Sequence, residues 1–322
     1  MRKILNVLLI IGIVFGLSQG IVLAQDKETQ GTLTLSGAWA IYPTVVSWAE
    51  AFQKLHPNVK IDVSAGGAGK GAADAIAGLV DIGMVSREPD PSEIKQGITP
   101  VYILHDAIFA VVSGENPILD ELLKKGVKKE ILTGIYITGL LTKWDQVVGR
   151  DVSLSVGKAG KPIHVYTRSD SCGAAGSWAG YFGKKQDDLK GIGIYGDPGL
   201  LEVAKKDPLG IGFNNFSYVF TREGSVVKGA RLVPIDANGN GQADSYEIFT
   251  NRADAVAAIE AGKYPVTRKN YFFVKGKPKG LVLEFIQFVL SDEGTKVVND
   301  VAASLPLPKE EREKVLLSLV GI

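Results

Sequence analysis

Apolar and polar residues alternate at the start of the predicted folded region, and the spacing then becomes helical. In "GTLTLS", Leu33 and Leu35 alternate with polar residues, as in a half-buried strand. The next apolar residues lie three and four positions apart and predict a helix with one buried face: Val45, Val46, Trp48, Ala49, Phe52 and Leu55. "NVKIDVSA" alternates again, "GGAGKGAADAIAGL" predicts a glycine loop before a short helix, and "VDIGMVS" is a short apolar strand. This order predicts an α/β fold with a largely parallel sheet.

A second set of elements repeats the alternation of strand and helix. "DAIFAVVSGENP" is an apolar strand that ends at Asn116-Pro117, and "KEILTGIYITGLLTKWDQV" predicts a helix and a turn. "KPIHVYTRSD" predicts a strand that leads directly into another helix-like segment. Two such units predict two similar lobes, with a ligand site between them at the carboxyl ends of strands.

The N-terminal segment has the layout of a secretory signal peptide. Arg2 and Lys3 precede an apolar run, and small residues end at Ala24, which predicts cleavage after residue 24. The alternative is a membrane anchor, but the apolar run is short and "SQG" interrupts it. No cysteine lies near the cleavage position, so nothing favours a lipid anchor. We therefore expect residues 1–24 to be a signal peptide and the protein to be periplasmic.

Charge and cysteine content narrow the function classes. Removal of residues 1–24 takes away two basic residues and no acidic one, which leaves 34 basic and 35 acidic residues and a net charge of −1. Nucleic-acid binding depends on neutralising phosphates, so a near-neutral exported chain is a poor candidate for it. The single cysteine, Cys172, excludes an internal disulfide. The length of 322 residues exceeds what one compact core usually serves, which agrees with two lobes.

The stretch "TRSDSCGAAGSWAGYF" combines fixed charge with very small side chains. Its aromatic residues predict one buried helix face, and its helix is expected to start near Ser171. The first N–H groups of a helix lack internal partners, so an anion could bind there, and four small residues would let it approach closely: Cys172, Gly173, Ala174 and Ala175. Arg168 could add a bidentate contact. A thiol at such a helix start tends to have a lowered pKa and a reactive thiolate.

An ordinary capped helix is the alternative interpretation of the same stretch. Asp170 or Ser171 would then be the N-cap, and Arg168 would be a surface charge. A second glycine-rich turn shifts the balance toward anion binding. "AGGAGKGAADAI" places four glycines before a helix start, yet it matches neither the nucleotide P-loop nor the dinucleotide spacing. Exposed N–H groups with little steric cover remain, as in an anion-binding nest, and "SGAWAIYP" is a third strand-to-helix turn.

Taken together, these motifs resemble the phosphate-binding proteins that serve ABC importers, a family of type II periplasmic binding proteins. The strongest match is "RSDSCGA" from Arg168 to Ala174, against a family pattern of Arg-x-Asp-x-Ser-Gly-Thr. Weaker matches occur in the expected order at "SGAWAIYP", "LVDIGMVSRE", "LTKWDQVVG" and "GIGFNNFSY". The resemblance implies a two-lobed α/β fold with a ligand cleft between the lobes. It also implies a monomeric solute-binding protein that delivers inorganic phosphate to a membrane permease, without enzymatic activity or a required cofactor.

The resemblance implies a set of ligand-binding positions, several of which depart from the family. They are Ile41, Tyr42, Ala68, Gly69, Ser86, Arg168, Asp170, Cys172, Gly173 and Ala174. Cys172 and Ala174 stand where the family has hydroxyls, Ile41 replaces a threonine, Ala68 replaces a serine, and Ser86 replaces an aspartate. Arg168 and Asp170 survive as the charged pair. Phosphate is therefore the expected ligand, with sulfate, molybdate or tungstate as alternatives.

The resemblance also implies where the chain crosses between the lobes. "AIFAVV" would be one crossing and "YPVTRKNYFFV" the other. Lobe one would then comprise residues 26–113 and 266–322, and lobe two residues 114–265. Hinge closure of the lobes over the ligand is the expected motion.

Two other function classes are alternatives to a transport protein. A hydrolase needs a nucleophile paired with a base, but none of the three histidines, His56, His105 and His164, lies in a nucleophile motif. Cys172 could pair with a distant histidine, although a lone cysteine is more often a small half-buried residue. An adhesion or signalling protein of the same fold is the stronger rival, and binding of free phosphate would separate the two.

A twelve-residue segment outside the predicted cleft matches a calcium-binding loop. "DANGNGQADSYE" fits Asp-x-Asn-x-Asn-Gly-x5-Glu, with Gly241 at the sharp turn. The oxygen ligands would come from Asp236, Asn238, Asn240, Asp244 and Glu247, and from the backbone carbonyl of Gln242. Two neutral amides suggest modest affinity, and the ion would be a structural Ca2+ rather than a required cofactor. The alternative is an acidic turn that binds no metal.

Overall fold

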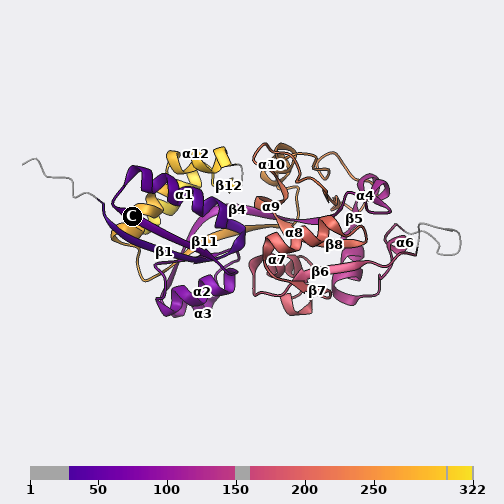
Figure 1. The fold of residues 1–322 in the computed structure, drawn as a ribbon, viewed down its shortest axis with the longest axis horizontal. Coiled ribbons are helices and arrows are strands. Elements are labelled where there is room, and N and C mark those ends of the chain that lie inside the picture. Colours follow the sequence, from indigo (N-terminus) through magenta and orange to yellow (C-terminus); the bar gives the residue numbers. More distant parts are fainter. Residues whose placement is uncertain (1–28, 149–159, 302–303, 321–322) are drawn as a thin grey trace, which may run out of the picture.

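The computed structural model describes residues 29–148, 160–301 and 304–320. The predicted signal peptide at 1–24 lies outside these ranges. Two lobes lie end to end along the long axis of the molecule, and strands run from one into the other (Figure 1). In the part of the chain that the structure describes, no helix has both the length and the apolar character needed to cross a bilayer.

The first lobe is built on parallel strands that are each followed by a helix or turn. β1 pairs in parallel with β2 and β3, as the alternating patterns predicted. The helices lie on both faces of this sheet (Figure 1). The elements of this segment are β1 (Gly31–Gly37), η1 (Trp39–Ile41), α1 (Tyr42–Leu55), β2 (Val59–Ala65), α2 (Ala68–Ala77), β3 (Ile82–Val85) and α3 (Pro91–Lys95).

Two long strands join the lobes. β4 (Ile98–Ser113) and β11 (Thr267–Lys275) pair antiparallel in lobe one. From Ile108 onward β4 pairs instead with β8 (Gly210–Asn215), so the same strand enters the second lobe. The strands therefore form one sheet. Its order is β2-β1-β3-β11-β4-β8-β6-β7, in which β6 is His164–Arg168 and β7 is Ile192–Ile194, and β9 (Ala230–Leu232) and β12 (Leu305–Pro306) also pair with β4.

The second lobe repeats the parallel strand–helix arrangement. β6 (His164–Arg168) pairs in parallel with β7 (Ile192–Ile194) and β8. α7 (Gly173–Tyr181) follows β6, and α8 (Gly196–Lys206) follows β7. The remaining elements are α4 (Leu119–Lys125), β5 (Val127–Lys128), α5 (Lys129–Thr133), the π-helical turn η2 (Gly134–Thr138), α6 (Trp144–Val147), η3 (Gln186–Asp188), α9 (Phe216–Val219), β9 (Ala230–Leu232), β10 (Ile235–Asp236) and α10 (Arg252–Glu260).

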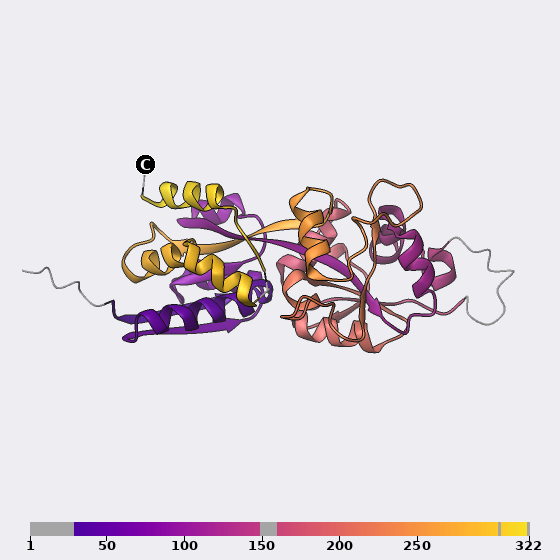
Figure 2. The same ribbon diagram turned by 90° about the horizontal axis from the view of Figure 1, so that it is seen from above.

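The C-terminal segment returns to the first lobe. Figure 2 shows its helices beside the N-terminal strands, so both ends of the described chain build the same lobe. α12 packs against α1, where the Trp48 indole N–H donates to the Gly294 carbonyl at 2.8 Å. The elements here are α11 (Gly280–Val289), α12 (Asp292–Val301), β12 (Leu305–Pro306) and α13 (Lys309–Val320).

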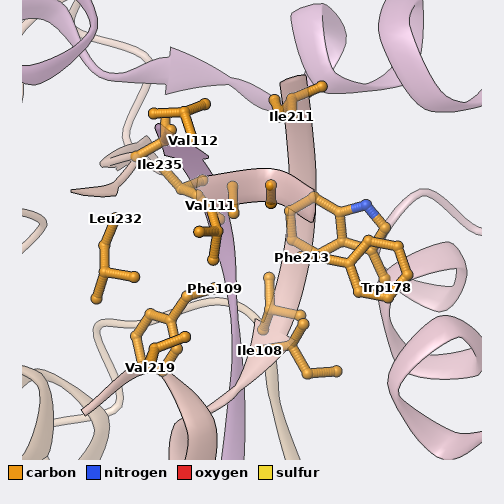
Figure 3. Packing of buried hydrophobic residues seen from close by; sticks show 14 of the residues in the cluster. Ile108, Phe109, Val111, Val112, Trp178, Ile211, Phe213, Val219, Leu232 and Ile235 are labelled. Carbon is orange, nitrogen blue, oxygen red and sulfur yellow. The ribbon is translucent and has the colours of Figure 1, made fainter. Parts of the chain in front are cut away.

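Each lobe has its own hydrophobic core. The largest buried side chains of lobe one are Trp48, Phe52, Phe272, Phe273 and Phe285. Those of lobe two are Phe109, Tyr136, Trp144, Trp178, Phe213 and Phe216. In lobe two the rings of Trp178 and Phe213 stack with centroids 5.5 Å apart (Figure 3). Removing one such ring typically costs about 3–5 kcal/mol of stability.

The packing bears on where the chain passes between lobes. Residues 107–112, assigned to lobe one by the sequence, pack in the core of lobe two. Val101 and Leu104, a few residues earlier on the same strand, pack in the core of lobe one. The packing therefore favours a crossing near Asp106, and the boundaries at 113/114 and 265/266 stay a prediction.

Candidate functional site

The turn between β6 and α7 begins the candidate site. β6 ends at Arg168 and α7 begins at Gly173, with Cys172 as the N-cap. The Cys172 Sγ accepts the Ala175 N–H at 3.4 Å, so the N-cap is neither Asp170 nor Ser171, the two residues that the capped-helix alternative named. The Asp170 carboxylate is not available for capping because it is bound to Arg168. The first turn of α7 therefore presents small residues beside a charged pair.

Arg168 is a buried charge between two carboxylates. Its side chain has no exposed surface, so the alternative of a surface charge is wrong. Its Nε and Nη2 donate to the two oxygens of Asp170 at 2.8 and 2.6 Å. Its Nη1 forms an ion pair with Asp197 Oδ1 at 2.8 Å, and both atoms are buried. One positive charge thus stands against two negative charges inside the protein.

Asp197 is a site residue that the sequence analysis did not find. It lies in the first turn of α8 and is 1% exposed. Burial raises the pKa of its carboxyl, and the nearby positive charge of Arg168 opposes that shift. The only local signal was an acidic residue at a helix start, where the helix dipole favours negative charge. That signal is too common to mark a site.

The pKa and the burial of the Cys172 thiol differ from what the sequence predicted. Cys172 is 8% exposed, and burial raises the pKa of its thiol to about 11, although Arg168 opposes the shift. The expectation of a lowered pKa and a reactive thiolate is therefore wrong, because desolvation outweighs the effects of the Arg168 charge and the Ala175 N–H, which favour the thiolate. Cys172 and Ala174 both contribute side chains to the core of lobe two. They would face a ligand through backbone N–H groups.

The glycine loop of lobe one lies directly against this turn. The Gly69 N–H donates to the Ser171 carbonyl at 3.2 Å. A Cβ on Gly67, whose φ is +92°, would lie 2.7 Å from the same oxygen. Ala68 is the first residue of α2 and is buried. The glycines are therefore needed here for close approach between lobes, whatever they bind.

Ser86 meets the start of α7 from the other side. It follows β3 and is 2% exposed. A Cβ on Gly173 would lie 1.9 Å from the Ser86 carbonyl oxygen and 2.4 Å from its Oγ. Only glycine permits the two backbones to approach this closely. The two predicted residues thus come together across the boundary between the lobes.

The turn after β1 supplies the third side of the site. The Ile41 side chain is buried in the core of lobe one, and Tyr42 is half-buried at the start of α1. Trp39, not predicted from the sequence, lies edge-on to Tyr195 of lobe two with ring centroids 6.0 Å apart. The Tyr218 hydroxyl donates to the Trp39 carbonyl at 3.0 Å. The lobes are therefore closed on each other at all three turns.

A second buried ion pair lies where the connecting strands cross. Arg268 of β11 donates through Nε and Nη2 to Asp106 Oδ2 of β4, at 2.9 and 2.6 Å. Its Nη2 also contacts the Asn215 side-chain oxygen at the end of β8. Burial raises the pKa of Asp106, and Arg268 opposes the shift. This pair joins three strands near the boundary between the lobes.

The histidines take part in other contacts. The His164 Nδ1 lies 2.6 Å from Asp207 Oδ2. His105 is hydrogen-bonded to the Tyr102 hydroxyl, and the ring of His56 lies beside that of Phe52. These contacts supply no base for Cys172.

The predicted calcium loop begins at β10 with a buried carboxylate. Asp236 is 3% exposed and accepts the N–H groups of Asn240 and Gly241 at 3.0 and 2.8 Å. The Glu247 oxygens accept the N–H groups of Ala237 and Asp244 at 2.9 and 3.0 Å. Among the described residues, no group of three or more His, Cys, Asp or Glu side chains is arranged to hold a metal ion. The remaining predicted ligands are the Asp244 carboxylate and the amide or carbonyl oxygens of Asn238, Asn240 and Gln242. The Asp244 Oδ2 accepts the side-chain N–H groups of Asn238 and Asn240 at 2.7 and 3.1 Å.

Comparisons with known proteins agree on one family. The model of the PBP superfamily domain matches residues 24–293. The phosphate-binding protein PstS of Bacillus subtilis is 24% identical over 273 residues, covering 85% of this chain and 80% of that protein. The protein of the same name from Pseudomonas aeruginosa is 27% identical over 308 residues, covering 90% of this chain and 87% of that protein.

Solved structures show the same fold. One is a Clostridium perfringens protein solved with bound phosphate and described as a substrate-binding protein of a phosphate ABC transporter. It has a TM-score of 0.69 and 23% identity, covering 86% of this chain and all of that chain. An ABC-type phosphate transport receptor from Vibrio cholerae has a TM-score of 0.62 and 21% identity, with the same coverage of both chains.

Proposed function

The chain belongs to the PBP superfamily and has the two-lobed α/β fold of type II periplasmic binding proteins, and on that premise we propose that it captures inorganic phosphate between its lobes and delivers it to an ABC importer. The named relatives are transport binding proteins rather than enzymes. A signal peptide at residues 1–24, a periplasmic location, a membrane permease as partner and a monomeric state all belong to this proposal. So does the absence of catalytic activity.

The observation that carries the proposal is the state of Arg168. A buried guanidinium normally has all its donors satisfied, because an unpaired buried donor costs about 1–3 kcal/mol. The Arg168 Nη1 has only an ion pair with Asp197 Oδ1, 2.8 Å away, and no further partner at the point where three strand-to-helix turns of two lobes meet. An oxyanion placed there would accept from Nη1 and from the free N–H groups at the start of α7.

Four other predicted ligand residues support this proposal, because they meet at the boundary between the lobes. Gly69 and Ser86 come from lobe one, and Asp170 and Gly173 come from lobe two. Their backbone groups would contact the ligand only after closure, which supports a hinge mechanism. Ile41, Cys172 and Ala174 would contribute through the backbone, since their side chains lie in the cores.

Phosphate titration tests the proposed function. Trp39 lies at the boundary between the lobes, so we expect added phosphate to change the tryptophan fluorescence in a saturable way. Sulfate, molybdate, tungstate and chloride at matched ionic strength are the controls. If another tetrahedral oxyanion saturates the fluorescence change and phosphate does not, that oxyanion and not phosphate is the ligand. No response to any of them, confirmed by calorimetry, would contradict an oxyanion-binding function and favour the adhesion or signalling alternative.

We also propose that the loop Asp236–Glu247 binds one structural Ca2+. Support comes from the register of the oxygen ligands and from Gly241, whose φ is +81°. The loop's N–H groups already orient the Asp236 and Glu247 carboxylates from opposite ends of the segment. β10 pairs with β5, so a bound ion would stabilise an edge of lobe two.

We expect millimolar calcium to raise the thermal unfolding midpoint of the protein relative to chelator. Ligand at 100 times its Kd contributes about 2.7 kcal/mol, and each kcal/mol shifts the midpoint by about 2–4 °C in a domain of 150–250 residues. Asp236→Asn should remove the calcium-dependent difference, whatever it does to the midpoint in chelator. Asp62→Asn, at an exposed carboxylate of β2, should retain it. Equal midpoints with calcium and with chelator would show that the segment is only a turn.

A further inference from the structure

The side chain of Gln186 binds the backbone of the turn that precedes α7. Its Oε1 accepts the Cys172 N–H at 3.1 Å, and its Nε2 donates to the Asp170 carbonyl at 2.7 Å. A backbone N–H needs an acceptor and a carbonyl needs a donor, so the two contacts use both ends of the amide. Gln186 therefore ties together two residues of the turn that are separated only by Ser171.

We propose that Gln186 is a positioning residue of the anion site, because it holds the turn Asp170–Cys172 in its binding conformation before a ligand arrives. This inference rests on the proposed oxyanion-binding function. A turn that is already ordered loses less conformational freedom on binding, and this raises the affinity. Gln186 lies outside the motif "TRSDSCGAAGSWAGYF", and no local pattern in the sequence marks it.

The conformation of this turn matters because the chain lacks hydroxyl side chains here. Cys172 and Ala174 stand where the resemblance implies hydroxyls, and both side chains lie in the core of lobe two. The ligand would therefore be held by N–H groups at the start of α7, and the turn sets the directions of these groups. The Cys172 N–H can be shared between Gln186 and a ligand, since bifurcated hydrogen bonds are common at helix ends.

Both Gln186 hydrogen bonds lie within lobe two, so they do not depend on closure of the lobes. The Ser171 carbonyl accepts the Gly69 N–H at 3.2 Å, but that bond joins the two lobes and is lost when they separate. The Asp170 carboxylate is bound to Arg168, which orients the side chain rather than the backbone of Asp170. Gln186 can therefore keep the backbone of the turn in place while the lobes are open.

The segment that carries Gln186 is itself fixed by hydrogen bonds. Gly183, with a φ of +72°, follows α7 and lets the chain turn. The Asp188 carboxylate then accepts the Lys185 N–H at 2.8 Å, and the Leu189 N–H donates to the Gln186 carbonyl at 3.0 Å. Gln186 is half-buried, whereas the residues on either side of it are exposed. Its side chain is thus held inward from a surface turn.

Calorimetry with inorganic phosphate compares Gln186→Met with the unaltered protein. Methionine has nearly the length of glutamine but makes neither hydrogen bond, so the phosphate affinity should fall by about tenfold or more. Gln146→Met is the matched control, because the Gln146 Oε1 also accepts backbone N–H groups, those of Thr142 and Lys143 at 2.9 and 3.0 Å. It lies on α6, at the far end of lobe two (Figure 1), and its replacement should leave phosphate affinity unchanged. Unchanged affinity in a folded Gln186→Met protein would overturn the inference.

Labelling of the Cys172 thiol with iodoacetamide, without phosphate, is the second readout. A buried thiol reacts only after local opening, so the labelling rate reports how firmly the turn is held. We expect Gln186→Met to be labelled about ten times faster or more, and Gln146→Met to be labelled at the rate of the unaltered protein. A role in stability alone would lower the unfolding midpoint of Gln186→Met without this change. Lower phosphate affinity with an unchanged labelling rate would therefore also overturn the inference.

Hydrogen exchange of the unaltered protein decides the matter if Gln186→Met does not fold. The Cys172 N–H should exchange slowly without phosphate, because Gln186 binds it, and exchange as fast as in an unstructured peptide would overturn the inference. If the unaltered protein binds no tetrahedral oxyanion, the proposed function fails and the inference fails with it. If the unaltered protein binds phosphate and Gln186→Met binds it equally well, only the inference fails.

Discussion

Replacing Arg168 by alanine is expected to weaken phosphate binding by about 30-fold or more. Loss of one partner from a buried, hydrogen-bonded charge pair costs about 2–5 kcal/mol, and 1.4 kcal/mol corresponds to a factor of ten. The variant also leaves Asp170 and Asp197 without their shared cation. Their negative charges would then face the anion directly.

Calorimetry with phosphate measures this effect, and Arg312→Ala is the matched control. Arg312 is similarly buried and bonded to Asp292, but it lies on α13 of lobe one. Its removal should lower the unfolding midpoint and leave phosphate affinity unchanged. Unchanged affinity in a folded Arg168→Ala protein would remove Arg168 from the site and with it the main support for the proposed function.

Adding a single methyl group at Gly173 is expected to prevent full closure of the lobes. The new Cβ would lie 1.9 Å from the Ser86 carbonyl oxygen, far inside any real contact, so the two backbones must separate. Separation lengthens the ligand's bonds to whichever lobe moves away. Loss of two or three hydrogen bonds of about 1 kcal/mol each corresponds to about a 30- to 150-fold loss of phosphate affinity. Helix stability should not fall, because alanine favours helix more than glycine does.

Gly176→Ala in the same helix is the control for this substitution, because its Cβ would meet no atom within 4 Å. Small-angle scattering should show the unaltered protein and Gly176→Ala becoming more compact with phosphate, whereas Gly173→Ala should not. Calorimetry gives the affinities of all three proteins. Normal compaction and affinity in Gly173→Ala would show that the lobes do not approach as closely in solution as the structure places them.

The local pattern of apolar and polar residues was sufficient to predict the strands and helices that position the site. Alternation at Leu33 and Leu35 and glycine loops before helices predicted the strand-to-helix turns that the structure contains. The predicted buried face of α7 is confirmed at Trp178, because its side chain has no exposed surface. These features follow from residue spacing alone, because strand and helix repeats place side chains on fixed faces.

The sequence did not predict which residues distant in the chain become neighbours at the site. Asp197 follows an unremarkable helix start, and only the packing of α8 beside β6 brings it to Arg168. Trp39 lies in the turn motif "SGAWAIYP", yet its place at the site depends on contact with Gly196 of the opposite lobe. The pKa of Cys172 was expected to fall with the helix dipole, whereas burial raises it.

The sequence by itself determined the class of fold, the order of the turns and the resemblance to phosphate-binding proteins, because these depend on local spacing and on residues in one motif. Only the tertiary structure decided which groups share a surface. It placed Ser86 against Gly173, Gly67 against Ser171 and Asp197 beside Arg168. The physical reason is that charge and desolvation depend on through-space distance, and residues of two lobes far apart in the chain become neighbours only when both cores are packed and the lobes close.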